Sequence, residues 1–474
     1  MEKGNSLKAL TLQGFFTLEG LAANLCIIFL SFFLLNHRQN LYIYISRIMT
    51  TYLNNLNLKT ISLSLLVFTA ASCQMGEQSA NQRENTSVSI QQFGVLPENA
   101  PETNRKNLQK AIEWAAPRGA ALFVTPSEDP YRIGSGIILK GNVSIVGVHG
   151  PTPRGTKHPD KNQPVGSVFA IQDTDKPFIT VETGTMLRGL QFWYPDQTTH
   201  EASKIIAYPP TIQVSKDKHT QGVTLSNLTF YGEYISMDFN ASPEFACELI
   251  LIEHCYGYPL GGEFIRIDYC YDIPRILHCH VNPAMQRFIS GGYTKELVDA
   301  VIARKKFTYA INHTDNAQLM DVFTFGSYGG ILLGPSTYGQ LTNFNLDCVT
   351  VGIQKQGDND FNRNWQIAQG SIIANTGTTV EEIHPIIIEG KGHTALSNVE
   401  AFSGDNGALT NLGKSWDFMT IRGEEKCTVS IYGSRMRNYV SDSPLSILNP
   451  NAMVVAMACV DKEEKAYHFN NNIK

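Results

Sequence analysis

The feature that most constrains the fold is a short element, Leu-x-Asn-Leu or a close variant, that recurs directly after strand-like segments. It occurs at residues 225–228, 341–344 and 396–399, with looser copies at 187–190 and 319–322. The third residue of each copy is Asn, Gly or Asp, and these residue types tolerate a left-handed backbone better than most. A bend that repeats along the chain therefore explains the element, and stacked Asn side chains at such a bend can also hydrogen-bond to one another.

The segments that precede these copies carry apolar residues at alternate positions, as a half-buried strand does. They read FITVETG, TIQVSKD, ISMDFNA, EFIRIDY, TYAINHT, GILLGPS, VGIQKQG, IIIEGKG and FMTIRGE. The unit returns roughly every 22 to 50 residues, which is the period of a solenoid with loops of varying length. An all-β sandwich also has short alternating strands. We favour the solenoid, because a sandwich gives no reason for the same bend to follow each strand.

Composition and charge exclude some classes of protein. The chain has 474 residues, of which 43% are hydrophobic and 17% charged, so it can bury a large core. Its formal net charge of -5 gives no basic field of the kind that attracts phosphates, so nucleic acid is not expected as a partner. None of the 9 cysteines forms a C-x-x-C pair. We therefore expect buried core thiols, no metal site and no cofactor.

The N-terminal region has the features of an export signal. After Lys59 the apolar run ISLSLLVFTAAS ends in small residues before Cys73, which resembles a bacterial lipoprotein signal peptide. The resemblance implies a signal peptide at 49–73, lipidation of Cys73 and a polar tether at 74–87. Residues 1–48 hold a second apolar segment and are interpreted as a mis-assigned start. The expected location is a membrane-anchored protein of the periplasm or cell surface, with plain secretion as the alternative.

Residues 88–147 form the first folded segment, in which strands flank one amphipathic helix. The helix is expected over about 104–116, with Leu108, Ile112 and Ala115 on one side, and Pro117 follows it. Such a helix would cap an open edge of the strand stack.

Four motifs in this segment carry a family resemblance. They are F-G-V at 93–95, the helix itself, P-x-x-x-x-Y-x-I at 126–133 and N-V-S-I-V-G at 142–147. Together they resemble the first folded part of pectate-lyase-like proteins, a family that includes rhamnogalacturonase-like and polygalacturonase-like members. The resemblance implies an all-β fold, a right-handed parallel β-helix over 148–474 with one N-terminal capping helix. It also implies a polysaccharide as substrate, pectin-like and acidic.

The catalytic motifs of polygalacturonases do not map onto this chain. The closest segments are His313-Thr314-Asp315, Gly357-Asp358-Asn359-Asp360 and Gly392-His393-Thr394, and none has the required form. No carboxylate cluster of the calcium-binding pectate-lyase type stands out either, so calcium is considered only for a lyase. The resemblance therefore leaves the site to be found from the strand pattern.

Alternation places four polar side chains on the outer face of consecutive strands. If Ile265 and Ile267 point inward, Arg266 and Asp268 point outward, and the same rule exposes Asp238 and Asn312. Stacking in register would bring Asp238 and Asp268 about 4.8 Å apart, near the spacing of retaining glycosidases. We predict Asp238, Asp268 and Arg266 as catalytic and Asn312 as substrate-binding. The alternative is solvated surface acids, or carboxylates that pair with Arg266.

The segment 253–283 concentrates groups that bind uronates or transfer protons. It supplies the remaining predicted substrate-binding residues, which are Tyr269, Tyr271, Asp272, Arg275 and His280. An insertion at about 283–307 follows, with the helix-like run TKELVDAVIARKK, and it would wall a groove beside these residues.

Two classes of function remain open at the level of sequence. The first is an enzyme: a glycoside hydrolase using the two acids, or a uronate lyase using Arg266 with Tyr269 or His280. The second is a non-catalytic surface protein that binds a glycan, for which Trp193, Trp365 and Trp416 are candidate aromatic platforms.

Overall fold

Short strands in parallel ladders make up most of the structure. The structure is a computed structural model that describes residues 87–148, 157–286, 292–357, 364–374, 383–401 and 415–472. The predictions for 1–48, for 49–73 with Cys73, and for the tether up to residue 86 lie outside the described residues. Within the described ranges, no helix combines the length and the apolar character needed to cross a bilayer.

One sheet, called sheet I here, has 11 strands that pair in parallel and in chain order. Its strands are β4 (Ile137–Leu139), β7 (Ile179–Val181), β10 (Ile212–Val214), β14 (Ile235–Asn240), β18 (Glu263–Asp268), β22 (Phe307–Ile311), β25 (Gly329–Leu333), β28 (Val351–Lys355), β30 (His384–Ile388), β32 (Met419–Ile421) and β35 (Leu445–Ile447).

A second sheet, sheet II, has 23 strands. They are β1 (Ser87–Ser89), β2 (Ala121–Phe123), β3 (Tyr131–Ile133), β5 (Ser144–Val146), β6 (Val168–Ile171), β8 (Met186–Arg188), β9 (Gln191–Trp193), β12 (Thr224–Ser226), β13 (Thr229–Tyr231), β16 (Leu251–Glu253), β17 (Tyr256–Gly257), β20 (Arg275–Leu277), β21 (His280–Val281), β23 (Ala317–Met320), β24 (Phe323–Phe325), β26 (Gly339–Thr342), β27 (Asn345–Val349), β29 (Asn364–Ala374), β31 (Gly392–Ala401), β33 (Cys427–Tyr432), β34 (Arg435–Met436), β36 (Ala452–Val460) and β37 (Ala466–Asn470). Sheet III holds β11 (Thr220–Gln221), β15 (Cys247–Glu248) and β19 (Cys270–Tyr271).

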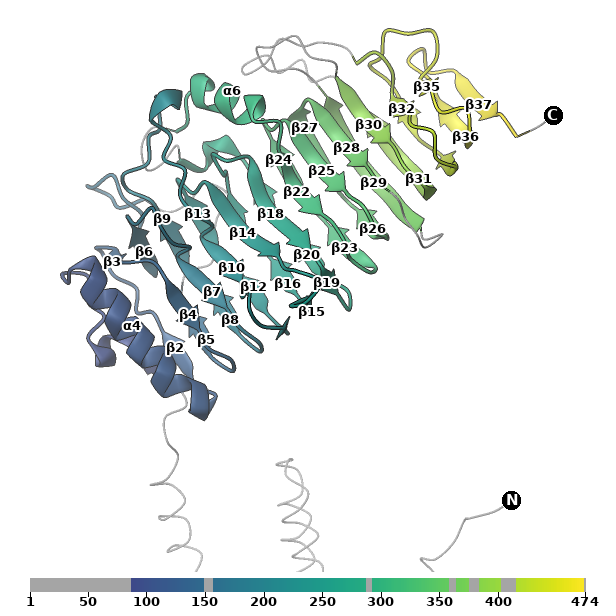
Figure 1. The fold of residues 1–474 in the computed structure, drawn as a ribbon. Coiled ribbons are helices and arrows are strands. Elements are labelled where there is room, and N and C mark those ends of the chain that lie inside the picture. The colour runs from purple at the N-terminus through teal and green to yellow at the C-terminus, as the bar shows by residue number, and fades with distance from the viewer. Residues whose placement is uncertain are drawn as a thin grey trace, which may run out of the picture. The chain divides into compact units, whose positions relative to one another are not determined.

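The chain passes through these sheets in a repeating order, as Figure 1 shows. One turn runs through β14 in sheet I, β15 in sheet III, and β16 and β17 in sheet II, before β18 returns to sheet I. Each strand pairs in parallel with its counterpart one turn later, for example β14 with β18 and β16 with β20. The predicted all-β solenoid of stacked parallel strands is therefore observed, and each turn is called a coil below.

The predicted recurrent bend lies within sheet II, between the two short strands of each coil. Asn227, Asn343 and Asn398 have φ of 54°, 53° and 52°, while Asp321 has 54° and Gly189 has 68°. All five elements found in the sequence are thus left-handed bends, as predicted. Backbone amides form bonds between coils at this bend. The Asn227 N–H donates to Glu253 O at 3.1 Å, and the Asn343 N–H donates to Ala368 O at 3.2 Å.

Replacing Asn343 tests the conformational origin of the bend. Asn343→Val is expected to lower the free energy of unfolding by about 1–2 kcal/mol, because a β-branched residue is strained at positive φ. Asn343→Gly should leave it nearly unchanged, since glycine populates this region freely. Urea unfolding of both variants makes the measurement. Equal losses in the two variants would mean that the Asn side chain, and not the backbone angle, stabilises the bend.

The inward side chains of all coils form one continuous apolar core. Ring stacks run through it: Phe192 lies 6.4 Å from Phe169 and 5.2 Å from Phe230, measured between ring centroids. Trp365 is also fully buried, which contradicts its prediction as a surface platform. Trp193 is half-buried against Tyr231, while Trp416 is exposed.

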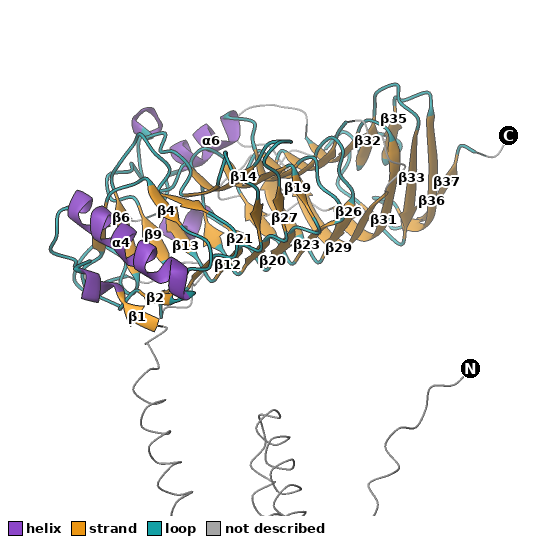
Figure 2. Cartoon of the chain, turned by 60° about the horizontal axis from the view of Figure 1, so that its bottom comes forward, coloured by secondary structure: helices purple, strands orange, loops and turns teal. Residues whose placement is uncertain are grey.

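Helix α4 (Pro101–Ala115) covers the N-terminal end of the strand stack (Figure 2). It packs on β2, β3 and β4, with Leu108, Ile112 and Ala115 buried as predicted. Asn104 is buried too, and its side-chain amide donates to Leu96 O and Arg132 O, both at 2.8 Å. The predicted capping helix is confirmed.

A second helix, α6 (Lys295–Ala303), lies in the insertion at 283–307, where the sequence also has a helix-like run. Residues 287–291 of the insertion lie outside the described part. Short 3-10 turns occupy Ile90–Phe93, Ala116–Arg118, Ala202–Lys204 and Pro283–Gln286.

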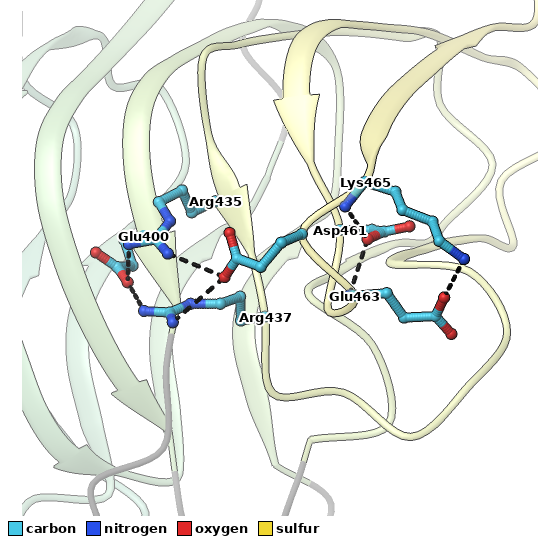
Figure 3. A network of polar contacts seen from close by, with 7 residues as sticks. Glu400, Arg435, Arg437, Asp461, Glu463 and Lys465 are labelled. Carbon is cyan, nitrogen blue, oxygen red and sulfur yellow. Dashed lines mark hydrogen bonds and ion pairs between the residues drawn. The ribbon is translucent and has the colours of Figure 1, made fainter.

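At the C-terminal end, β37 turns back antiparallel to β36. A network of charged side chains holds this end (Figure 3). Arg435 contacts Glu400 at 3.3 Å and Glu464 at 2.9 Å, and Arg437 contacts the same two carboxylates. These two arginines and two glutamates balance in charge, and they link β31, β34 and the turn between β36 and β37. The network therefore has a structural role, since its ion pairs hold the last coil against the one before it.

Candidate active site

The strands β14 and β18 present polar side chains on the outer face of sheet I. Met237 and Phe239 on β14, and Ile265 and Ile267 on β18, are buried in the core as predicted. Strand alternation turns Asp238, Arg266 and Asp268 to the opposite face. The face chosen by the sequence pattern is therefore correct.

The register between the two strands differs from the predicted column. Asp238 lies opposite Arg266, and Asp268 lies opposite Asn240. Asp238 and Asp268 are thus not neighbours across the ladder but are offset by two residues. A shift of two positions keeps every side chain on its face, so the apolar pattern could not detect it. The spacing of a parallel sheet places the Cα atoms of these two residues about 8 Å apart on a diagonal, instead of about 4.8 Å.

Asp238 is the centre of an ion-pair cluster. Its Oδ2 accepts from Arg266 Nη2 at 2.7 Å and lies 3.6 Å from Lys216 Nζ, and its Oδ1 accepts from the Asn240 N–H at 3.0 Å. Arg266 Nη1 lies 3.6 Å from Glu263 Oε2. The carboxylate is 7% exposed because these partners cover it. Asp238 is therefore paired with Arg266 across the ladder.

Asp268 belongs to a different pair, formed with a histidine from the next coil. Asp268 Oδ1 lies 2.7 Å from His313 Nδ1, and the two side chains are 23% and 30% exposed. The ring of Tyr269 stacks on the His313 ring at 4.4 Å with an interplanar angle of 4°. Tyr269 and His313 both have positive φ, 51° and 36°. Positive φ also occurs at the other bends of the coils, and the ring stack fixes the orientation of the imidazole.

Three of the other predicted binding residues lie after β18, in or directly after β19 of sheet III, or at the start of β20 in sheet II. Tyr271 lies in sheet III beside Glu248, at 37% exposure, and exposed Asp272 follows it. Arg275 already belongs to sheet II, where its guanidinium donates to Ile273 O at 3.2 Å.

Two further predicted residues have clear positions. Asn312 directly follows Ile311, the register partner of Ile267, so it continues the row of Asp268. His280 lies on β21 in sheet II and stacks on Phe323 at 4.2 Å. His280 does not join the site, because it lies on sheet II and the site lies on the outer face of sheet I.

The insertion lies at the amino end of the sheet I strands, whereas Asp268 lies at the carboxyl end of β18. Helix α6 buries Leu297, Val298, Val301 and Ile302, and its N-terminal turn contacts the 199–202 loop. Arg304, after the helix, donates to the Tyr234 hydroxyl at 3.0 Å. The described part of the insertion therefore borders this face of the sheet, but it does not lie against the Asp268–His313 pair.

Three members of the site were not predicted: Lys216, Glu263 and His313. Lys216 and His313 each come two residues after the last residue of a sheet I strand, and Glu263 opens β18. The predicted alignment of Asp268 with Asn312 agrees with the register of β18 and β22, and it already places Tyr269 beside His313. His313 was missed because it lies beyond the end of its strand, where alternation no longer assigns a face.

A buried carboxyl group lies just before β14. Glu233 is fully buried and accepts from the Ser236 hydroxyl at 3.1 Å and from the Tyr258 N–H at 2.9 Å. Its other oxygen has no hydrogen-bond partner. Burial raises the pKa of Glu233 from 4.5 to about 7, and the two hydrogen bonds offset only part of this effect.

This group makes stability depend on pH in a defined direction. Between pH 4.5 and about 7 the folded chain holds a proton on Glu233 that the unfolded chain has released. The contribution to stability is complete below pH 4.5 and is lost as the pH rises to about 7, at a cost on the order of 2–3 kcal/mol. Urea unfolding at pH 5 and pH 8 should show a smaller difference for Glu233→Gln than for the wild type. An unchanged difference would contradict the assignment.

In the residues that the structure describes, no group of three or more His, Cys, Asp or Glu side chains is arranged to hold a metal ion.

Comparison with known proteins gives distant structural similarity only. No family model matches the chain, and no curated protein matches it. Full-length tailspike protein 2 from Escherichia coli O157:H7 bacteriophage CAB120 has a TM-score of 0.48 and 13% identity, over 76% of this chain and 46% of that one. DFA-IIIase from Arthrobacter chlorophenolicus A6 has a TM-score of 0.42 and 11% identity, over 79% of this chain and 94% of that one. The pre-mature gene product 12 of bacteriophage phi29 has a TM-score of 0.43 and 10% identity, over 82% of this chain and 54% of that one. The chain spans about half the length of these two phage proteins.

Proposed function

We propose that the outer face of sheet I at β14 and β18 cleaves a polysaccharide by hydrolysis. One observation carries the proposal: the short Asp268–His313 contact of 2.7 Å lies on the same sheet face as a second carboxylate, Asp238. Glycoside hydrolysis needs two groups that exchange protons on either side of the scissile bond. A face with two separately held carboxylates meets that need.

The diagonal offset favours a particular kind of hydrolysis. Carboxylates carried on backbone positions about 8 Å apart can adopt the separation of roughly 6.5–9.5 Å that leaves room for a water molecule beside the sugar. Asp238, which lies against two cations, is the carboxylate that would accept a proton from that water. The Asp268–His313 pair would then protonate the leaving oxygen.

Hydrolysis fits the side chains better than elimination from a uronate. A lyase needs a cation free to neutralise the sugar carboxylate, and Arg266 is already engaged by Asp238 and Glu263. His280, one candidate base for elimination, lies on sheet II, and Tyr269 is stacked on His313. A pectin-like acidic substrate therefore remains one candidate among several.

A substrate panel tests the proposal. The protein is incubated with polygalacturonate, rhamnogalacturonan, alginate, xylan and β-glucan, and both reducing ends and ultraviolet absorbance of unsaturated products are followed. New reducing ends without absorbance support hydrolysis, while absorbance would replace it by a lyase. Silence on all substrates with retained binding to one of them would favour the non-catalytic glycan-binding protein.

We also propose that the chain is exported as a lipoprotein attached through Cys73, on the basis of the sequence before this residue. Growth with an alkyne-tagged fatty acid should label the protein. The Cys73→Ala variant is the control and should carry no label. Absence of the label from the wild type would contradict lipidation and favour secretion without a lipid anchor.

A further inference from the structure

Four buried cysteines form two pairs between the same two consecutive coils. Cys247 on β15 lies directly opposite Cys270 on β19. Cys255 lies opposite Cys279, since the residues on either side are in register, Glu253 with Leu277 and Tyr256 with His280. All four are free thiols in the structure and are at most 1% exposed.

The backbone spacing of each pair is compatible with a disulfide bond. Residues in register on neighbouring parallel strands have Cα atoms about 4.8 Å apart, inside the range of about 4.4–6.8 Å found in disulfides. In each pair one thiol also raises the pKa of the other, as a neighbouring sulfur does. Core packing alone requires only a small apolar side chain at each position. It gives no reason for cysteine to lie opposite cysteine twice between the same two coils, once in sheet III and once in sheet II.

We propose that Cys247–Cys270 and Cys255–Cys279 are disulfide pairs that join the coil of Asp238 to the coil of Arg266 and Asp268. This inference does not depend on the hydrolysis proposed above. Each link closes a loop of one coil, and so it reduces the freedom of the unfolded chain where the site residues are held.

The chemistry is thiol–disulfide exchange with a disulfide oxidant. The thiolate of one cysteine attacks one sulfur of the oxidant and forms a mixed disulfide, while the second sulfur of the oxidant leaves as a thiolate and takes up a proton. The second cysteine, as its thiolate, then attacks the mixed disulfide, so that the S–S bond forms and the other half of the oxidant is released as a thiol. The cysteine pair loses two electrons and two protons, and the oxidant gains them.

The exchange must precede burial. Burial raises the pKa of the Cys255 and Cys270 thiols well above the usual value, and the neighbouring thiol raises it further. Few thiolates therefore exist in the folded chain, and an oxidant cannot reach them. We expect the links to form during folding and then to resist reductants.

Peptide mapping tests the inference on the full chain. The protein is unfolded with reductant, refolded with reduced and oxidised glutathione, denatured with iodoacetamide and digested. Mass spectrometry should find the two cross-linked peptide pairs, and both should disappear when reductant precedes alkylation. Cys427 and Cys459, which are buried opposite residues other than cysteine, should be alkylated throughout.

Two results would overturn the inference: alkylation of all four cysteines after oxidative refolding, or cross-links to Cys427 or Cys459 in place of the two pairs. Cys270→Ser separates the pairs, because Cys247 should then be alkylated while Cys255–Cys279 remains linked. A variant in which Cys247 instead links to another cysteine would show scrambling and would also count against the proposed pairs.

Discussion

Asp268→Asn is expected to lower the rate of glycan cleavage by about 10²- to 10⁴-fold, the contribution typical of one general acid or base. Asn keeps the shape of the side chain and can still accept a hydrogen bond from His313, so the Asp268–His313 geometry of 2.7 Å should survive. What it loses is the negative charge and the ability to exchange a proton. The measurement is reducing-end release on the substrate that the panel identifies.

Asp321→Asn is the matched control for this variant. Asp321 also contacts a histidine, His278 Nδ1, at 2.8 Å, but both residues lie at the left-handed bend of sheet II. Removing this carboxylate should leave the cleavage rate within about twofold, since exposed ion pairs contribute little. Equal losses in the two variants would contradict the placement of the site on sheet I.

Phe192→Ala is expected to lower the free energy of unfolding by about 3–5 kcal/mol. Phe192 is fully buried and lies within 6.4 Å of three other rings, those of Phe169, Phe178 and Phe230. Because the coils are joined by these rings across consecutive ladders, the cavity cannot collapse without moving several strands. Denaturant unfolding followed by circular dichroism makes the measurement.

Leu448→Ala is the control for that loss, because Leu448 is 65% exposed on the same solenoid. Its effect should stay within about 0.5 kcal/mol. A loss below about 1 kcal/mol in Phe192→Ala would mean that the stack of rings is not a cooperative part of the core, and it would weaken the account of the fold.

The local rules of the fold were readable in the sequence. Asn227, Asn343 and Asp321 were assigned to bends because few residue types accept a positive φ, and the structure places them there. The alternation of Ile265 and Ile267 assigned the faces of β18 because side chains of a strand point to opposite sides in turn. Both rules act over a few residues.

The contacts between coils could not be read in the same way. Pairing of β14 with β18 starts from Ile235 opposite Glu263, and a slip by two residues would have buried the same apolar side chains. The partner of Asp238 therefore changed from Asp268 to Arg266. His313 was overlooked for another reason: it lies two residues after the end of β22, where strand alternation no longer assigns a face, although Asp268 and Asn312 were aligned correctly.

Hydrogen–deuterium exchange with the cleaved glycan tests the central claim most directly, with Asp268→Asn used so that the ligand persists. The account predicts slower exchange on binding in the segments that follow β14, β18 and β22, namely 241–246, 269–274 and 312–316. Slower exchange confined to the bend residues of sheet II, or none in these three segments, would contradict the assignment of the outer face of sheet I as the site that acts on the glycan.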